Sequence, residues 1–157
     1  MDKYNIVMPQ EVKDIIKQIE AAGFEAFAVG GCVRDCILGR TPQDWDITTS
    51  ALPSQIKEIF ARTIDTGIQH GTVTVMIGKT GYEITTYRID GEYKDCRHPE
   101  NVEFSSDLKD DLKRRDFTIN AMAYNDSTGL VDEFDGINDL NKGIIRCVAV
   151  SYTHLRA

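Results

Sequence analysis

This sequence has no long apolar stretch, and its first residues do not have the pattern of a secretory signal. Residues 1–12 contain no basic stretch followed by an apolar one, which is the pattern of a secretory signal. No segment approaches the roughly 18 consecutive apolar residues with which a helix crosses a bilayer. These absences predict a soluble, cytoplasmic protein.

Thiol and imidazole ligands are scarce. The chain has three histidines and four cysteines, and no two cysteines show the two-residue gap that is common in zinc sites. Cys32 and Cys36 could line one face of a helix, either as metal ligands or as packing residues. Because no histidine or second cysteine pair stands nearby, packing in the core as reduced thiols is the favoured interpretation.

Positive charge is also in short supply. Eighteen Lys and Arg residues face 25 Asp and Glu residues, which gives a net charge of −7. That sign excludes a protein whose affinity for nucleic acid comes from its overall field. Any contact with nucleic acid must be local, or must lie outside this chain. With 157 residues, 41% of them hydrophobic, the chain can bury one core and is expected to form one domain.

The hydrophobic pattern predicts helices alternating with strands. Apolar residues at helical spacing, with glycine or proline at the ends, indicate helices at residues 11–22, 33–38, 53–60 and 136–140, and over most of residues 108–122. Short apolar or alternating runs indicate strands at residues 24–29, 44–48, 129–132 and 144–146, and a β-hairpin of residues 72–77 and 82–87. Residues 88–107 are polar without a period and are expected to form a long loop. A mixed sheet is therefore plausible.

A glycine turn before a helix is the first candidate for chemistry. Gly30 and Gly31 precede Arg34 and Asp35. Glycines let the backbone approach a triphosphate, and a helix N-terminus then offers free N–H groups. Taken alone, two such glycines are more often only a tight turn.

Acidic residues supply the second candidate. Asp44 and Asp46 stand one residue apart on an expected strand, so both side chains emerge on the same face. Such a pair suits Mg²⁺, which binds through one or two carboxylates together with substrate phosphates. Glu83, in the second strand of the hairpin, could complete a three-carboxylate site. The alternative for each residue is an exposed position on a solvated strand.

The third candidate is the run Arg114-Arg115-Asp116-Phe117-Thr118-Ile119-Asn120. Arginine can bind a phosphate through two parallel hydrogen bonds, and Asp or Asn can bind a ribose hydroxyl. A solvated helix face is the alternative, but the apolar residues interleaved with the polar ones argue against a purely surface role.

Several stretches, in this order, resemble the head domain of the class II tRNA nucleotidyltransferase and poly(A) polymerase family. They are AVGGCVRDCILGR, DWDITTSALP, EITTYR, DGEYKDCRHPENVEF, DLKRRDFTINAMAYN and GLVDEFDGINDLNKGIIR. The match covers roughly residues 10–148, and the order of the stretches is far more specific than any single motif. The resemblance implies an α/β (α+β) protein with the polymerase-β-like nucleotidyltransferase fold, a mixed β-sheet flanked by helices.

The resemblance also implies roles for individual residues. Asp44, Asp46 and Glu83 match the catalytic, metal-binding carboxylates, which would hold two Mg²⁺ ions. The nucleotide-binding positions are Gly30, Gly31, Arg34, Arg115, Asp116 and Asn120. Among these, Gly31 and Arg34 match positions that hold the triphosphate, whereas Arg115 and Asp116 match positions near the ribose. Residues 90–99 match a flexible segment that assists nucleotide selection.

By the same resemblance, the expected reaction adds CMP and AMP from CTP and ATP to the 3′ end of tRNA. Poly(A) addition and CC-only or A-only addition remain open, as does a catalytically silent fragment that binds only nucleotide and metal. A dinucleotide-binding module is disfavoured because Gly30-Gly31-Cys32 does not make the three-glycine fingerprint.

The end of the chain departs from the family pattern. Residues 1–148 are expected to form the head domain, whereas residues 149–157 resemble nothing in the family and are interpreted as a truncation of the neck domain. Base selection and most contacts with tRNA are expected to belong to the missing regions.

Overall fold

The computed structural model describes residues 6–89 and 103–148. Its α-helices are α1 (Gln10–Ala21), α2 (Gly31–Ile37), α3 (Pro53–Ile59), α4 (Leu108–Lys113) and α5 (Gly136–Lys142), with 3₁₀ turns η1 (Ile68–His70) and η2 (Thr118–Asn120). The strands are β1 (Ala26–Val29), β2 (Asp46–Thr49), β3 (Thr63–Gly67), β4 (Thr72–Ile77), β5 (Thr80–Thr86), β6 (Arg88–Ile89), β7 (Glu103–Phe104), β8 (Ala123–Asn125) and β9 (Gly129–Val131).

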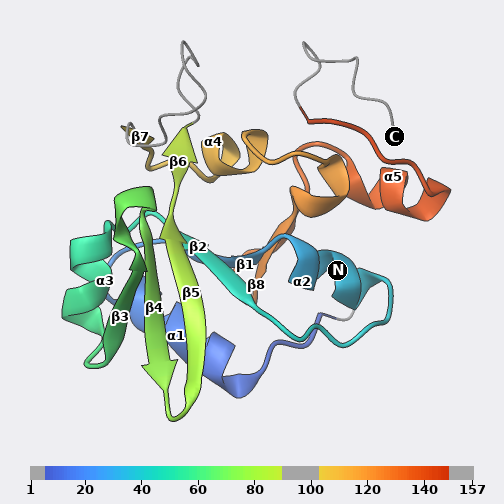
Figure 1. The fold of residues 1–157 in the computed structure, drawn as a ribbon. Coiled ribbons are helices and arrows are strands. Elements are labelled where there is room, and N and C mark those ends of the chain that lie inside the picture. Colours follow the sequence, from blue (N-terminus) through green and yellow to red (C-terminus); the bar gives the residue numbers. More distant parts are fainter. Residues whose placement is uncertain (1–5, 90–102, 149–157) are drawn as a thin grey trace.

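Seven of these strands form one mixed sheet in the order β3-β4-β5-β2-β1-β8-β9 (Figure 1). β2 and β5 pair in parallel, with Ile47 opposite Ile84, and the other neighbouring pairs of this sheet are antiparallel. β6 and β7 pair separately. This parallel pair lies in the middle of the sheet. Because β2 and β5 run in the same direction, both strands start at the same edge of the sheet.

One face of the sheet carries the larger core. α1 presents its buried residues Val12, Ile15, Ile16 and Ile19 to this face, as their helical spacing requires. They pack in one cluster with α3 and with alternate residues of β1, β2, β4 and β5. Residues at every second position of these strands therefore point into the core, and the residues between them point to the opposite face.

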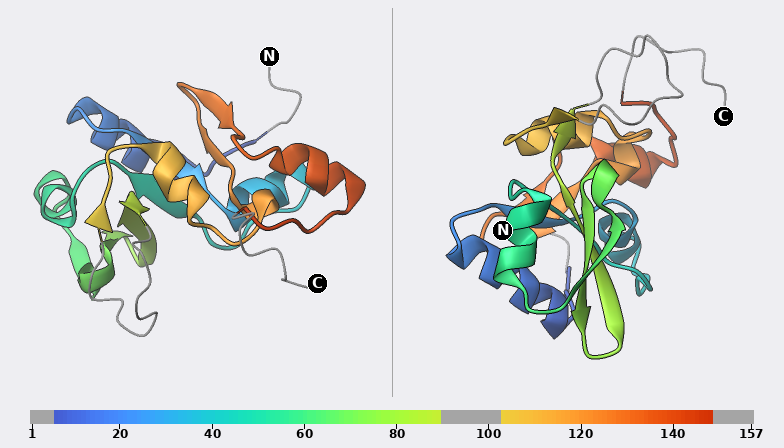
Figure 2. Two further views of the ribbon diagram at one scale, coloured as in Figure 1. Left: turned by 90° about the horizontal axis from the view of Figure 1, so that it is seen from above. Right: turned by 60° about the vertical axis from the view of Figure 1, so that its left-hand side comes forward.

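The opposite face carries a smaller cluster and is only partly covered. Phe27 and Val29 of β1 pack there with Leu108 and Leu112 of α4. Figures 1 and 2 show α4 and α5 grouped on one side of the molecule, away from α1 and α3. The starts of β2 and β5 lie outside this small cluster, so the side chains of Asp46 and Glu83 are only partly covered and keep contact with solvent.

Most of the expected elements are confirmed, but the helix predicted over residues 108–122 is wrong. α4 ends at Lys113, and the chain then pairs with the C-terminal segment through a Phe117–Cys147 bridge. Residues 123–125 leave this segment as β8 and pair with β1. Long-range pairing thus overrides helix propensity. The strand expected at residues 144–146 is also wrong, because the structure has no strand there and only an isolated bridge at the next residue, Cys147. The strands β3, β6, β7 and β8 were not predicted.

Two expectations fall outside the described residues. One is the nucleotide-selecting segment at residues 90–99, and the other is the tail at residues 149–157. Across residues 6–89 and 103–148, no helix combines the length and apolar character needed to cross a membrane.

Candidate active site

The pairing of β2 with β5 brings two acidic residues together. Asp46 is the first residue of β2, and the register that sets Ile47 opposite Ile84 places Asp46 beside Glu83. Ile47 and Ile84 are buried in the larger core, so the alternation of a strand directs Asp46 and Glu83 to the opposite face. Asp44 lies in the segment just before the strand rather than within it.

The charges of these carboxylates act on one another. Partial burial raises the pKa of Asp46, and the negative charges of Glu83 and Asp44 raise it further, while the positive charge of Arg115 opposes the rise. The charges of Glu83, Asp44 and Arg115 thus all act on the carboxylate of Asp46. Carboxylates that repel each other in this way form a site that is stabilised by a bound cation.

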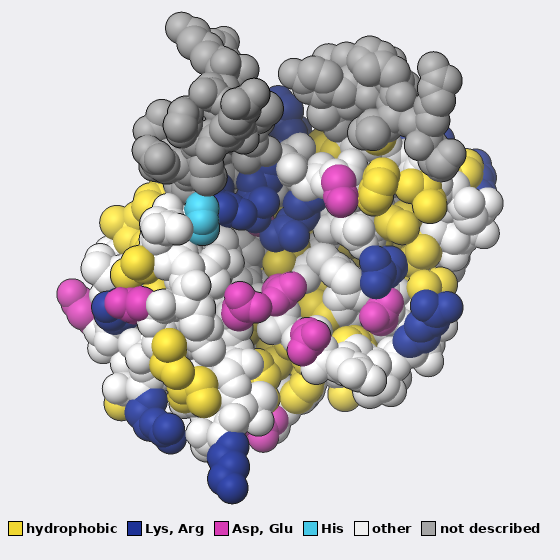
Figure 3. All heavy atoms as spheres, viewed as in Figure 1, with side chains coloured by type: hydrophobic (Ala, Val, Ile, Leu, Met, Phe, Trp, Pro, Cys, Tyr) yellow, Lys and Arg dark blue, Asp and Glu magenta, His cyan; other side chains and the backbone are white. Residues whose placement is uncertain are grey.

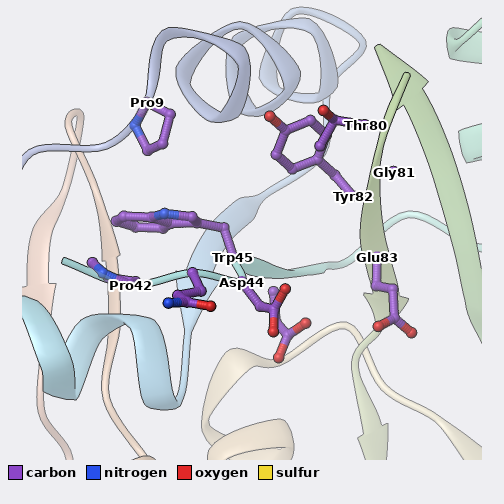
Figure 4. A pocket seen from close by; sticks show the side chains of 10 residues that line it. Pro9, Pro42, Asp44, Trp45, Thr80, Gly81, Tyr82 and Glu83 are labelled. Atoms are coloured by element: carbon purple, nitrogen blue, oxygen red, sulfur yellow. The ribbon is translucent and has the colours of Figure 1, made fainter. Parts of the chain in front are cut away.

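A cleft opens beside the carboxylates. Its volume is about 430 Å³, and it is lined by Pro9, Pro42, Gln43, Asp44, Trp45, Asp46, Thr80, Gly81, Tyr82 and Glu83. Figure 4 shows the carboxylates of Asp44 and Glu83 on one side of the rings of Trp45 and Tyr82. The volume lies within the range of small-molecule sites, in which apolar walls surround a few polar groups.

The glycine turn lies between two arginines. Gly30 has a φ of +85°, which favours glycine, and it is the residue just before α2. A Cβ at Gly30 would come within 3.5 Å of Arg115 Nη1, and one at Gly31 within 3.3 Å of Arg34 Nη2. The absence of side chains at this turn therefore gives both guanidinium groups room beside the backbone.

Arg34 is held in place by two partners. Its Nη1 donates to Asn120 Oδ1 at 2.7 Å, and its Nε donates to Asp35 Oδ1 at 3.1 Å. Arg34 and Asn120 stand 86 positions apart in the sequence, so the fold brings together two residues that were predicted separately.

Arg115 is held by a residue that the sequence reading missed. Asp111, fully buried on α4, accepts hydrogen bonds from Arg115 Nη2 at 3.1 Å, Thr48 Oγ1 at 3.1 Å and Arg114 Nε at 3.2 Å. Arg115 Nε is buried and has no hydrogen-bond partner among the described residues. Asp111 and Arg115 are four residues apart in the stretch for which the sequence predicted a helix, and this spacing is the signal that could have identified the support.

Asp116 is placed differently from the other candidates. It is exposed, and its carboxylate accepts a hydrogen bond from the backbone N–H of Phe117 at 2.8 Å. Its side chain is thus bonded to its own segment, and its place next to Arg115 in the sequence is what relates it to the other candidates.

The site combines a negative and a positive half on one face. Figure 3 shows acidic side chains gathered in the middle of this face, with Lys and Arg side chains directly above them. Within residues 6–89 and 103–148, no three His, Cys, Asp or Glu side chains converge closely enough to hold a metal ion as they stand. An ion here would thus take fewer than three of these ligands, and oxygens of water or of a phosphate would complete its shell. Such a combination suits a polyphosphate bound together with a divalent cation.

Comparison with known proteins agrees with this geometry. The CCA-adding enzyme of Lactiplantibacillus plantarum is 54% identical over 142 residues, which cover 90% of this chain and 35% of that protein. The CCA-adding enzyme of Leuconostoc mesenteroides is 53% identical over 144 residues, or 90% of this chain and 36% of that protein. This chain thus spans about a third of the length of these relatives.

Solved structures give the same result. The Bacillus stearothermophilus CCA-adding enzyme in complex with CTP matches with a TM-score of 0.82 and 43% identity, over 91% of this chain and 34% of that one. The Thermotoga maritima CCA-adding enzyme complexed with tRNA matches with a TM-score of 0.67 and 27% identity, over 92% and 34%. The expected nucleotidyltransferase fold is thereby confirmed. Residues 26–146 match the family described as the poly A polymerase head domain, and the chain belongs to that family of nucleotidyltransferases.

Proposed function

We propose that this chain is the catalytic head of an enzyme that adds CMP and AMP, from CTP and ATP, to the 3′ end of tRNA. The observation that carries the proposal is the meeting of Asp46 and Glu83 with Arg115 and the glycine turn on one face of the sheet. The relatives named CCA-adding enzyme, and the solved complexes of such enzymes with CTP, ATP and tRNA, support this choice of substrates. We expect the reaction to take place in the cytoplasm.

The phosphate end of the nucleotide is assigned to the glycine turn. Gly30 and Gly31 let the backbone approach the β- and γ-phosphates, and Arg34, held by Asn120, offers a fixed positive charge to the same oxygens. Arg115 and Asp116, which precede Asn120 in the segment between α4 and η2, would orient the ribose. The free Nε donor of Arg115, buried beside Gly30, is suited to an oxygen of the substrate.

Asp44, Asp46 and Glu83 would share the binding of Mg²⁺ with the triphosphate, each ion taking fewer than three of these carboxylates. The donor set fits, because hard oxygen ligands suit Mg²⁺ and because the mutual repulsion that raises the pKa of Asp46 would be relieved by a cation. When bound, the ions would neutralise charge on the phosphates and activate the attacking hydroxyl. We propose two ions, as the family resemblance implies.

In the proposed reaction, the 3′ hydroxyl of the RNA attacks the α-phosphate of the nucleotide. The hydroxyl gives up its proton to solvent, and its oxygen forms a bond to the α-phosphorus. The bond from that phosphorus to the oxygen shared with the β-phosphate breaks, and pyrophosphate leaves. The residues of this chain would contribute mainly by fixing the position of the triphosphate and by balancing its charge. Poly(A) addition is the second candidate, because the matching family is described by that activity. It uses the same chemistry with ATP alone.

The test is extension of a tRNA that lacks its 3′ CCA, with labelled CTP and ATP and Mg²⁺. Wild-type protein is compared with an Asp44→Ala/Asp46→Ala double variant. An Asp14→Ala/Glu58→Ala double variant serves as the control, since it removes the same charge from exposed positions on α1 and α3. We expect CMP and AMP incorporation by wild type and control, and none by the first variant.

Other results would lead to different conclusions. Incorporation of AMP alone would favour poly(A) or A-only addition. Binding of nucleotide with Mg²⁺ but no incorporation would identify a silent fragment. If wild type fails to bind nucleotide, the assignment of the site is wrong.

A further inference from the structure

A buried acid lies behind the nucleotide-binding segment and outside the candidate active site. Asp139 of α5 is 3% exposed. Its Oδ2 accepts hydrogen bonds from Thr118 Oγ1 at 2.6 Å and from Arg146 Nε at 3.2 Å. The side chain of Arg146 is 59% exposed, so the acid is buried while its cationic partner is largely in solvent. Burial of a carboxylate is costly unless its oxygens are well bonded, and here they hold one particular turn.

That turn is η2, which is fixed to α5 and to the C-terminal segment at several points. The hydroxyl of Thr118 donates to Asp139, and the backbone N–H of Thr118 donates to the carbonyl of Arg146 at 2.9 Å. On the other side, Gly136 lies so close to the carbonyl of Thr118 that a Cβ would overlap it. Thr118 is therefore held through its side chain, its N–H and its carbonyl.

The same turn carries a proposed nucleotide ligand. Asn120, two residues after Thr118, accepts the 2.7 Å hydrogen bond from Arg34. Its backbone carbonyl lies 3.9 Å from the position of a Cβ on Gly30. A shift of η2 would thus move the partner of Arg34 and the wall of the glycine turn together.

We propose that Asp139 is a positioning residue for the triphosphate: through Thr118 it fixes η2, and through Asn120 it fixes Arg34. This rests on the proposed function of Arg34 in binding nucleotide. The Thr118 hydroxyl and Arg146 hold the pKa of Asp139 below its ordinary value, so the acid remains an acceptor at neutral pH. Asp139 does not line the cleft beside the carboxylates. Because it acts through η2 on Arg34, we expect its loss to lower the affinity for nucleotide.

The test uses Thr118→Val, which keeps the shape of the side chain and removes the hydroxyl. Thr86→Val is the matched control, because Thr86 is equally buried and its Oγ1 donates at 2.6 Å to the carbonyl of Ala51, away from η2. Affinity for CTP with Mg²⁺ is measured by calorimetry, and thermal stability is measured in parallel. We expect Thr118→Val to weaken CTP binding about tenfold, which corresponds to one hydrogen bond. Thr86→Val should leave it within about twofold, and Thr118→Ser, which keeps the hydroxyl, should restore it.

The proposal would be overturned if Thr118→Val and Thr86→Val weakened CTP binding equally. It would also be overturned if Thr118→Val lowered thermal stability without weakening CTP binding. A second measurement needs no nucleotide. The side-chain amide of Asn120 and the Nε–H of Arg34 should shift in NMR spectra of Thr118→Val, but not of Thr86→Val. If wild type binds no CTP, the proposed function fails, and unchanged Asn120 and Arg34 signals would then show separately that Thr118 does not position them.

Discussion

Asp111 is a single buried charge that organises the cationic side of the site. Its carboxylate is fully buried and is bonded to Thr48 of β2, to the backbone N–H of Arg88, and to Arg114 and Arg115. One acid thus joins α4 to the middle of the sheet and holds Arg115 beside Gly30. Its removal would leave two guanidinium groups without this buried partner.

We expect Asp111→Ala to destabilise the fold by about 3–5 kcal/mol, the usual cost of breaking a buried ion pair by removing one partner. Urea denaturation followed by circular dichroism measures the change. Glu103→Ala, at an exposed position on β7, is the control for loss of one negative charge. A cost below about 1 kcal/mol would show that solvent replaces Asp111 without difficulty.

Cys32 gives a pH-dependent prediction. Burial raises the pKa of this thiol from 9.0 to about 11, and the negative charge of Asp46 contributes to the rise. Below pH 9 the thiol is protonated in the folded and the unfolded chain and does not affect stability. Between pH 9 and 11 the unfolded chain loses the proton first, so stability falls as the pH rises, by roughly 2–3 kcal/mol.

The measurement compares unfolding free energies of wild type and Cys32→Ala from pH 8 to pH 11. The difference between the two curves isolates the thiol from other groups that titrate in this range. Wild type should lose stability more steeply than the variant above pH 9. Parallel curves would contradict the assignment of a raised pKa.

At the scale of elements, the backbones of α5 and η2 pack in direct contact at Gly136 and Thr118. Gly136 opens α5 directly beneath the carbonyl of Thr118. Backbone atoms cannot move aside as the end of a flexible side chain can, so even one methyl group must push the two elements apart.

Gly136→Ala is therefore expected to lower the free energy of unfolding by about 1–3 kcal/mol. Gly67→Ala is the matched control, because Gly67 has extended backbone and a Cβ there would meet its nearest atom at an ordinary 3.4 Å. Thermal unfolding of both variants measures the difference. If the control loses as much stability as Gly136→Ala, the fit between α5 and η2 is not the cause.

Elements with a strong local pattern could be predicted from the sequence. α1, α3 and the β4–β5 hairpin follow from helical spacing, from proline at a helix start and from alternation around a glycine turn. The course of residues 114–125 could not be predicted, because Thr118 and Ala123 take their hydrogen bonds from residues distant in sequence.

The candidate residues of the site follow the same division. The sequence predicts four of these residues from their type and their spacing within short motifs: Asp44, Asp46, Arg34 and Arg115. Asp111 stands four residues before Arg115, a spacing that could have indicated its role. Asp139 is one acid among 25, and only its burial in the folded chain distinguishes it.

At the scale of the whole molecule, charge separates nucleotide binding from RNA binding. The net charge of −7 repels a polyanion at a distance, while Arg34 and Arg115 form a local positive site. We expect this chain to bind tRNA at about 0.15 M salt more weakly than the typical non-specific range of about 10⁻⁴ to 10⁻⁶ M. Fluorescence anisotropy with labelled tRNA measures the affinity, and a micromolar dissociation constant would contradict the expectation.

The single parallel junction of the main sheet, between β2 and β5, bears on how the molecule folds. Thr48 and Thr85, which meet across it, are 37 positions apart, whereas β4 and β5 are joined by a short turn. Contacts between distant segments carry a larger loop-closure entropy and form more slowly than local ones. The hairpin that carries Glu83 is thus expected to form early and to dock against β2 late. Asp46 and Glu83, which repel each other, would then meet only when β5 docks on β2, the same step that brings Ile47 and Ile84 together in the core on the opposite face.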